Sequence, residues 1–130
     1  MRAFDVILTD AAPVPVGSYS QAIRYGNLVL TSGFVGMHPS GAGVVHGGFE
    51  TELRQAIHNL QEVLDAAGCT LHDVIRVNVA LVEMSCYAEM DRIYREYFHA
   101  PLPTRTVVGV KELWGGAQVG LDVWALVREQ

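Results

Sequence analysis

The residue of this sequence best suited to chemistry is Arg105, at the head of an apolar stretch that reads Pro-Leu-Pro-Thr-Arg-Thr-Val-Val-Gly-Val over residues 101–110. A guanidinium stays charged at physiological pH, so it needs an anionic partner when it enters a half-buried strand. Its planar fork can bind a carboxylate through two parallel hydrogen bonds. We therefore predict that Arg105 anchors a carboxylate-bearing small molecule. An ion pair with a structural acid from a neighbouring strand or subunit is the alternative.

The histidine, cysteine and lysine residues do not indicate a further catalytic or metal-binding site. The five histidines show no HxxH or HExxH spacing, so we predict no metal site. Cys69 and Cys86 lack metal or redox spacing and are expected to be reduced thiols. Lys111 is the only lysine, and its position after a predicted strand indicates solvated surface rather than Schiff-base chemistry.

The elements that must position Arg105 follow the predicted order β-β-β-α-β-α-β-β. Alternating or apolar runs predict six strands, at residues 3–8, 21–25, 28–35, 73–83, 105–111 and 119–127. Gly26-Asn27 is typical of a tight hairpin turn between the second and third strands. Irregular loops are expected where prolines and glycines gather, at residues 13–19 and 36–48, the second with a short extended piece at Val44-Val45.

Two helices are expected. Apolar residues recur at three- and four-residue spacing over residues 50–67, and Gly68 supplies the stop. The polar residues of this segment, Glu52 and Asn59 among them, are assigned to a solvated face. The second helix is expected to begin at a Ser85 cap, to carry an apolar stripe as far as Phe98, and to end before Pro101.

This order predicts an α+β fold in which the two helices cover one face of a sheet of five to six strands. The other face would carry too much apolar surface to leave in water. Its residues are expected to be Leu28, Leu30, Phe34, Trp124 and Leu126. We therefore expect this face to pack against sister subunits in a closed symmetric oligomer.

The bulk composition limits the function classes. The 130 residues and 14.2 kDa are expected to form one domain spanning 1–130. The net charge of −5 and the scattered positions of the lysine and arginine residues argue against sequence-independent binding of nucleic acid. No run approaches the roughly 18 apolar residues of a membrane span, and the first residues lack the apolar region of a signal peptide, so a cytoplasmic location is expected.

Several motifs together resemble the reactive intermediate deaminase family, also called RidA, YjgF or UK114, over essentially the whole chain. Each motif alone is weak, but their order and spacing are specific. They are Pro-Val-Gly-Ser-Tyr-Ser-Gln-Ala at 15–22, Gly-Asn-Leu-Val-Leu-Thr-Ser-Gly at 26–33, Asn-Leu at 59–60, Ala-Ala-Gly at 66–68, Asp-Val at 73–74 and Pro-Thr-Arg at 103–105.

The resemblance implies a chorismate-mutase-like α+β fold assembled as a homotrimer. Three sheets would form a central barrel with the helices outside, and ligand clefts would lie at the subunit interfaces. Family members hydrolyse enamines and imines, such as 2-aminoacrylate and 2-iminopropionate, to 2-oxo acids and ammonium without a metal or cofactor. The expected partners are an imino, enamino or 2-oxo acid and further copies of the chain, with no nucleic acid and no membrane.

The resemblance also assigns site residues. Arg105 would bind the substrate carboxylate, and Tyr19, Ser32 and Gly33 would line the cleft. The alternative interpretations are that Tyr19 only anchors its own loop and that Ser32 only fills space at the edge of a strand. Deaminating members usually carry acid-apolar-acid on the last strand, where the first acid orients the water. Here that stretch is Val-Gly-Leu-Asp, so Gly120 has no side chain to do this. Asp122, two residues and about 7 Å farther along the strand, is the possible substitute.

Other departures from the family pattern make the cleft more apolar. Phe34 replaces a frequent glutamine, Val107 stands where a cysteine or similar small residue is common, and Asp91 takes a place often held by asparagine. A larger, more hydrophobic or pathway-specific imino acid is therefore a plausible substrate.

Two further functions compete with the deaminase. One is a non-catalytic trimer that binds a small carboxylate or a partner protein, because the usual acid is lost at Gly120. The other is a ribonuclease or translation inhibitor, a label often given to this family. It ranks last because the chain is acidic and lacks a paired His/Lys or metal-ligand cluster.

Overall fold

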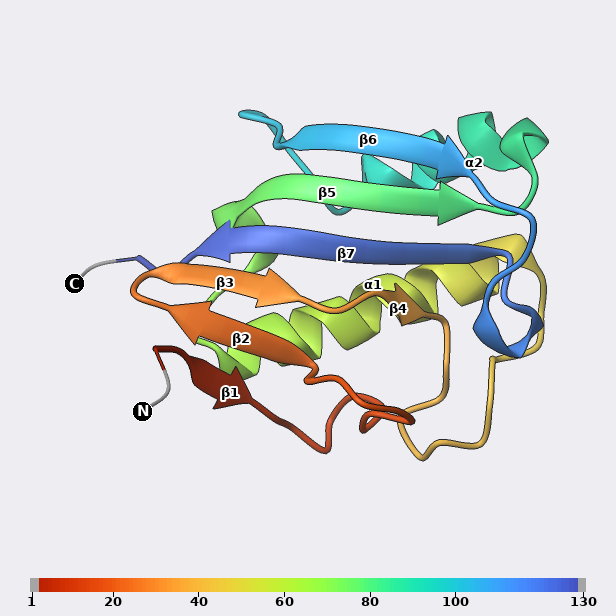
Figure 1. Cartoon of the computed structure of the whole chain (residues 1–130). Helices are drawn as coiled ribbons and strands as arrows, with labels where there is room; N and C mark the ends of the chain where they lie inside the picture. The colour runs from red at the N-terminus through yellow and green to blue at the C-terminus, as the bar shows by residue number, and fades with distance from the viewer. Residues whose placement is uncertain (1–2, 129–130) are drawn as a thin grey trace.

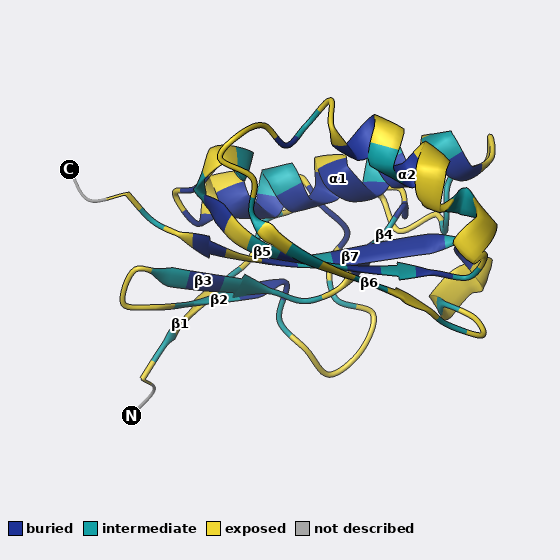
Figure 2. Ribbon diagram, turned by 90° about the horizontal axis from the view of Figure 1, so that it is seen from above, coloured by how far each residue is buried: buried dark blue, intermediate teal, exposed yellow. Residues whose placement is uncertain are grey.

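The computed structural model describes residues 3–128, which form one mixed sheet with two helices against one of its faces (Figures 1 and 2). The strands are β1 (Asp5–Ile7), β2 (Ala22–Tyr25), β3 (Leu28–Thr31), β4 (Phe34–Val35), β5 (Val74–Leu81), β6 (Thr104–Gly109) and β7 (Val119–Leu126). Their order is β1-β2-β3-β7-β5-β6, and β4 also pairs with β7. Among the strands described, only β5 and β6 are parallel neighbours. The predicted α+β class is confirmed, with β1 and β6 at the two edges.

The sheet has seven strands rather than six because the segment predicted at 28–35 is interrupted. Leu30 pairs with Trp124, but Phe34 pairs with Leu121, so the register against β7 shifts by one residue at Ser32-Gly33. A shift of one residue turns every following side chain to the other face. Phe34 is therefore buried in the core under the helices, and its predicted place on the uncovered face is wrong.

The first helix, α1 (Phe49–Ala66), packs its apolar side on the sheet as predicted. Leu53, Ile57, Leu60 and Leu64 are fully buried. Gly68 follows with a positive φ of 84°, a conformation that favours glycine, and the chain leaves the helix there.

The assignment of all polar α1 residues to a solvated face is wrong for two of them. Glu52 accepts hydrogen bonds from the backbone N–H and the side-chain amide of Gln118, both at 2.8 Å. Asn59 is fully buried and donates to the carbonyl oxygens of Val35 and Met37. These two side chains connect α1 to the chain before it, at Val35 and Met37, and to the chain after it, at Gln118. In each case they form hydrogen bonds with backbone groups, which require partners when they are buried.

The second helix, α2 (Tyr87–Tyr94), is shorter than predicted. Ser85 does not cap it, because that residue lies inside a 3₁₀ turn (Met84–Cys86) that precedes the helix. Residues 95–97 continue as turns, so the helix ends well before Pro101. The expected apolar stripe nevertheless packs on the core: Met90, Ile93, Tyr94 and Phe98 are buried.

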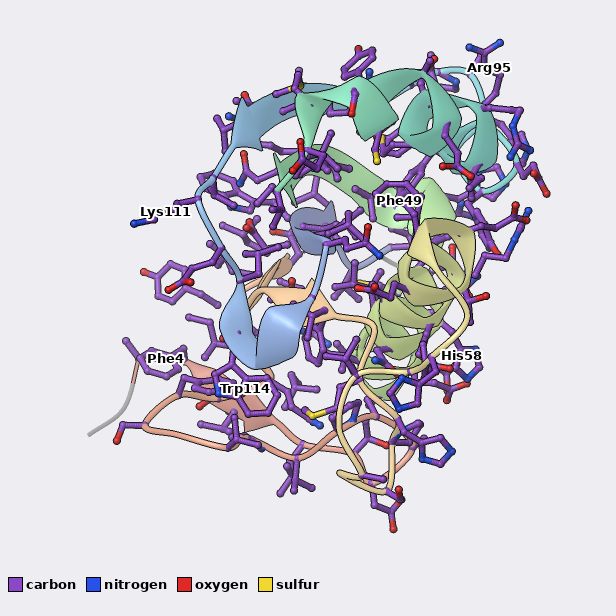
Figure 3. The ribbon with its side chains drawn as sticks, turned by 90° about the vertical axis from the view of Figure 1, so that its right-hand side faces the viewer. Phe4, Phe49, His58, Arg95, Lys111 and Trp114 are labelled. Carbon is purple, nitrogen blue, oxygen red and sulfur yellow. The ribbon has the colours of Figure 1, made fainter. Side chains whose placement is uncertain are left out.

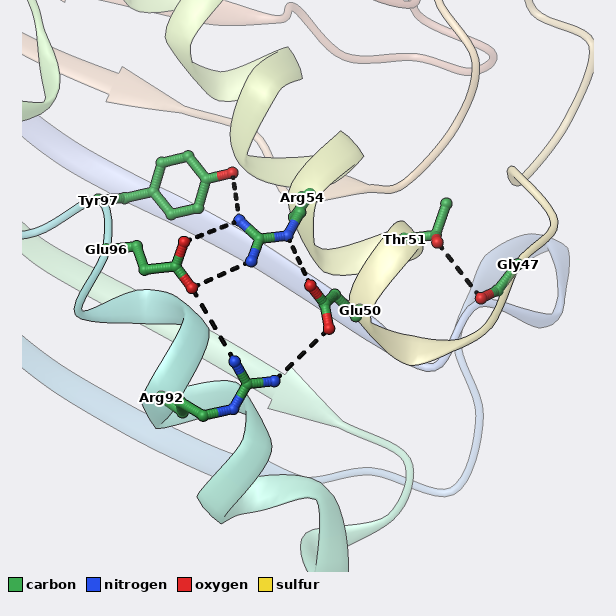
Figure 4. A network of polar contacts seen from close by, with 7 residues as sticks. All are labelled: Gly47, Glu50, Thr51, Arg54, Arg92, Glu96 and Tyr97. Carbon is green, nitrogen blue, oxygen red and sulfur yellow. Dashed lines mark hydrogen bonds and ion pairs between the residues drawn. The ribbon is translucent and has the colours of Figure 1, made fainter.

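A network of charges joins the two helices at their exposed sides (Figure 4). Arg54 of α1 binds Glu50 in its own helix and Glu96 in the turn after α2, each at 3.0 Å, and donates to the hydroxyl of Tyr97. Arg92 of α2 lies 3.5 Å from Glu50 and 4.0 Å from Glu96. The network therefore fixes α2 relative to α1, and α2 in turn positions the residues beside Arg105.

Both helices lie against one face of the sheet (Figure 2). The other face, here called the open face, carries apolar side chains of the paired strands β3 and β7. Leu28 and Leu30 are half-buried, whereas Trp124 and Leu126 remain 40% and 39% exposed. The prediction of an uncovered apolar face is confirmed for these four residues. Within residues 3–128, no helix is long and apolar enough to cross a membrane.

Candidate functional site

Arg105 is half-buried on the edge strand β6, and its guanidinium is held by α2. Its Nη1 donates to Oδ1 of Asp91 at 2.8 Å, and its Nη2 donates to the hydroxyl of Tyr87 at 2.7 Å. The guanidinium carbon lies 4.7 Å from the ring centre of Tyr94 and 5.5 Å from that of Tyr87. A guanidinium has five N–H donors, so this arrangement fixes the fork and leaves three donors for a ligand.

Asp91 is shared between two arginines. Its Oδ1 accepts from Arg105, and its Oδ2 accepts from Arg95 at 2.6 Å. The hydrogen bond from Arg105, followed by that from Arg95, lowers the pKa of Asp91 below its ordinary value of 3.8. Burial alone would lower the pKa of Arg105, but the bond to Asp91 and the neighbouring charges raise it instead. Both groups are therefore charged at neutral pH, and the three-residue cluster has a net positive charge.

A cleft of about 610 Å³ opens beside this cluster, here called the Arg105 cleft. Its lining includes Asp91, Tyr94, Arg95, His99 and Arg105. The hydroxyl oxygen of Tyr94 is buried and has no hydrogen-bond partner within the described part of the chain. Burial raises the pKa of Tyr94 to about 12, so the phenol is neutral and can donate a hydrogen bond.

A second set of candidates lines another cleft of about 390 Å³, the Tyr19 cleft. It contains Tyr19, Ser32, Gly33 and Phe34, with Trp114 from the β6–β7 connection. The Tyr19 hydroxyl accepts a hydrogen bond from the backbone N–H of Val16 at 3.3 Å, so this side chain also braces its own loop. The Ser32 hydroxyl donates to the carbonyl of Ser20 at 2.6 Å. Both polar groups are thus oriented by the loop that precedes β2.

Gly120 and Asp122 lie on the open face, in an adjoining cleft of about 330 Å³, the Gly120 cleft. Asp122 is half-buried and accepts a hydrogen bond from the side-chain amide of Asn78 at 2.8 Å. Gly33, Phe34, Val35 and Trp114 line both this cleft and the Tyr19 cleft, so the two adjoin.

The strand register places the two sets on opposite faces of the sheet. Arg105 pairs with Val77, and Val77 pairs with Val123, so Arg105 shares the face of these buried valines. Val107 is two residues farther along β6 and lies on the same side. Asp122 pairs with Asn78 and belongs to the open face. In Figure 3, Arg95 lies at α2, and Trp114 lies well away from it, on the β6–β7 connection. One chain therefore brings Arg105, Asp91 and Val107 together, but not with Tyr19, Ser32, Gly33, Gly120 or Asp122.

Several residues of these clefts were missed by sequence reasoning. Asp91 was assigned to the cleft from the sequence, but Tyr87 was not. Tyr87, Asp91 and Tyr94 share one side of α2, at the i, i+4, i+7 spacing that could have shown them as a group. Tyr94 was assigned to the core, which is correct for its ring but overlooks its contact with Arg105. No pattern in the sequence pointed to Trp114, because the conformation of its connection depends on long-range contacts.

Comparisons with known proteins identify the family. The family model described as Endoribonuclease L-PSP matches residues 9–127. The chain belongs to this family, which is the RidA/YjgF family. A 2-iminobutanoate/2-iminopropanoate deaminase of Mus musculus is 38% identical over 121 residues, covering 93% of this chain and 90% of the relative. A RutC family protein of Pyrococcus horikoshii is 40% identical over 109 residues, covering 84% and 86%.

Solved RidA/YjgF structures share the fold. The crystal structure of RidA from the Antarctic bacterium Psychrobacter sp. PAMC 21119 superposes with a TM-score of 0.91 at 33% identity, covering 95% of this chain and 99% of the other. E. coli TdcF with bound serine gives a TM-score of 0.89 at 26% identity, covering 96% and 99%. Among the residues described in this RidA/YjgF member, no group of three or more His, Cys, Asp and Glu side chains is placed to hold a metal ion.

Proposed function

We propose that this protein is an enamine/imine deaminase. It hydrolyses 2-imino and 2-enamino acids, such as 2-iminopropionate and 2-aminoacrylate or larger analogues, to 2-oxo acids and ammonium. Membership of the RidA/YjgF family and its relatives named 2-iminobutanoate/2-iminopropanoate deaminase support this reaction class.

The observation that carries the proposal is the fixed fork of Arg105. Asp91 and Tyr87 hold the guanidinium from one side, and its remaining N–H donors can take a substrate carboxylate. This anchor positions the adjacent imine carbon for attack by water. Water adds its oxygen to that carbon, a proton reaches the nitrogen, and ammonia leaves as the carbonyl forms.

The proposed site is completed by a second copy of the chain. Arg105 and Val107 of one copy would face Tyr19, Ser32, Gly33 and Gly120 of a neighbour in a homotrimer. The apolar open face and the position of β6 at the sheet edge support such an assembly. With no acid at Gly120, the nearest open-face carboxylate is Asp122, and we assign it the role of holding the water.

The test is the loss of 2-iminopropionate generated in situ by an amino acid oxidase. The wild-type protein should accelerate the loss, Arg105→Ala should abolish the acceleration, and Arg24→Ala on β2 should not change it. Asp122→Asn should lower kcat with little change in KM if Asp122 holds the water. An equal rate of imine loss with and without wild-type protein would refute the proposal.

A second candidate, a non-catalytic binder of small carboxylates, is favoured by one observation. Gly120 offers no acid, and the amide of Asn78 already occupies one oxygen of Asp122. For a binder, pyruvate should raise the melting temperature of the wild type but not of Arg105→Ala, and no imine should be turned over.

A further inference from the structure

Glycine is not required by the backbone at position 120. Its φ lies outside the left-handed region, and it stands in the regular part of β7. An added Cβ would meet Val35 Cγ1 at 3.5 Å and Leu113 Cδ1 at 3.8 Å, which are ordinary van der Waals distances. A Cβ would therefore fit. The effect of glycine here is to leave space over the sheet.

That space is apolar. The adjoining Tyr19 and Gly120 clefts share Phe34, Val35 and Trp114, and their outer parts add aliphatic side chains such as Val16, Met37, Val108 and Leu113. Asp122 is the one charged side chain that lines either cleft within residues 3–128, and it is paired with Asn78. Tyr19 and Ser32 supply polar groups at the opposite end.

The size and the aromatic wall suit a ligand side chain. Volumes of about 390 and 330 Å³ lie within the range of about 300–1,000 Å³ found for small-molecule sites. Trp114 is 56% exposed at the boundary of the two clefts, so one ring face can cover an apolar group placed there. A charged side chain would have to lose its hydration among aliphatic groups, which is unfavourable without a counterion.

We infer that the substrates are imino or enamino acids with a branched or aromatic apolar side chain, held in the adjoining clefts beside Val35 and Trp114. This inference rests on the proposed deaminase function. The carboxylate would be held by Arg105 of the neighbouring copy, and the absent side chain at Gly120 would make room for the apolar group.

The test compares full-length protein on four imines that an amino acid oxidase makes in situ from alanine, leucine, phenylalanine and glutamate. One methylene in an apolar pocket changes kcat/KM by about 10-fold or more. We therefore expect kcat/KM for the leucine and phenylalanine imines to exceed that for the alanine imine at least about tenfold. The glutamate imine should be the poorest. Equal values, or a preference for the alanine or glutamate imine, would overturn the inference while leaving the deaminase function intact.

Variants connect the preference to the clefts. Trp114→Ala should lower the ratio of leucine-imine to alanine-imine kcat/KM, and Gly120→Leu should lower it further by filling the space. Tyr25→Ala removes an aromatic ring that is 59% exposed at the β2–β3 turn, outside both clefts, and should leave the ratio unchanged. An unchanged ratio in Trp114→Ala and Gly120→Leu would contradict the assignment.

A binding measurement separates this inference from the proposed function. If no imine is turned over, the deaminase function fails, and the melting temperature is measured with 4-methyl-2-oxopentanoate, phenylpyruvate and pyruvate. Larger rises with the two bulky acids than with pyruvate, reduced in Trp114→Ala, would support the clefts as apolar side-chain sites. Equal rises, or none, would overturn it.

Discussion

At the scale of single residues, the contact between Arg105 and Asp91 reconciles two interpretations that the sequence left open. Arg105 does pair with an acid, although Asp91 comes from α2 and not from the neighbouring strand or subunit named in the alternative, and it occupies only one of five N–H donors. Arg105 can therefore be both paired within the chain and available to a ligand. The sequence could predict this arginine from its place on an apolar strand. It could not predict Asp91 as its partner, because that contact depends on how α2 crosses β6.

The Arg105–Asp91 contact should make stability depend on pH in the acidic range. The pKa of Asp91 is lowered in the folded protein, so its contribution is complete above its ordinary value of 3.8 and is lost as pH falls through the lower folded value. Asp91→Asn should reduce the free energy of unfolding at neutral pH by about 1 kcal/mol or less, since the pair is partly exposed.

Urea unfolding of wild type and Asp91→Asn across pH checks this expectation. The difference between the two proteins should shrink as pH falls below 3.8. Asp65→Asn, on the exposed side of α1, serves as the control variant. A difference that stays constant down to the lowest pH at which the protein folds would contradict the assigned role of the pair.

Gly120 offers a test of the missing acid. Gly120→Glu should fold, because a Cβ at this position has only ordinary contacts, and it should hydrolyse the small alanine-derived imine faster. Positioned acid-base groups contribute about 100-fold or more to catalysis, so a gain of at least about tenfold is expected in kcat. Gly120→Gln, which has the same size without the charge, should show no gain. Equal rates for Glu and Gln would mean that the added carboxylate does not reach the water.

At the scale of elements, the interruption between β3 and β4 shows the limit of pattern reading. Alternation from Leu28 and Leu30 extends naturally to Phe34, but the one-residue shift at Ser32-Gly33 reverses it. The hydrophobic pattern cannot reveal such a shift, since phenylalanine suits either face. By contrast, the period of α1 and the hairpin at Gly26-Asn27 were predictable because local residue types determine them.

Asn59 illustrates a polar residue that the helix pattern misassigned. Its amide donates to the carbonyls of Val35 and Met37, just where the chain leaves the sheet after β4. Asn59→Ala should lower the free energy of unfolding by about 1–3 kcal/mol, because it removes the side-chain donor from the buried hydrogen bond to the Met37 carbonyl, whereas the Val35 carbonyl keeps the backbone N–H of Met37. Chemical denaturation measures the change. His58→Ala, on the exposed side of the same turn, should stay within about 0.5 kcal/mol of wild type, and an equal loss in both variants would refute the role of Asn59.

At the scale of the whole molecule, the division of the candidate residues between two faces of the sheet is the main result. The fold class and the uncovered face could be predicted from the order of elements and their apolar residues. The division could not, because it requires the register of β5, β6 and β7 to be known. The proposed site therefore needs two copies of the chain. This can be tested by measuring the mass of the assembly and the activity of assemblies mixed from two inactive variants.

The assembly prediction is a particle of three times the chain mass of 14.2 kDa by light scattering. Trp124→Glu, which places a charge on the open face, should shift the mass toward that of one chain, because burying an unpaired charge between subunits is costly. Glu62→Lys on the helix side serves as the control and should keep the wild-type mass. A wild-type mass equal to one chain would rule out the trimer.

Shared sites predict complementation. Arg105→Ala and Gly33→Leu should each be inactive, the second because a leucine side chain fills the adjoining clefts. An added Cβ at Gly33 meets no atom within 4 Å, so this variant should fold. Co-assembled from the two variants, mixed particles should regain activity at interfaces that pair an intact Arg105 with an intact cleft. Mixing Arg105→Ala with the double variant should regain none, and failure of both mixtures would place the site within one chain.

The open face and the two edge strands also have a consequence for handling the protein. Trp124 and Leu126 are 40% and 39% exposed, and β6 lies at an edge of the sheet, so the proposed assembly would cover apolar surface and backbone groups that a single chain leaves in water. Folding free energy and association free energy are then linked by mass action, so dilution weakens both. If the chain assembles as proposed, its melting temperature should rise with protein concentration, so melting temperatures of variants must be compared at equal concentrations.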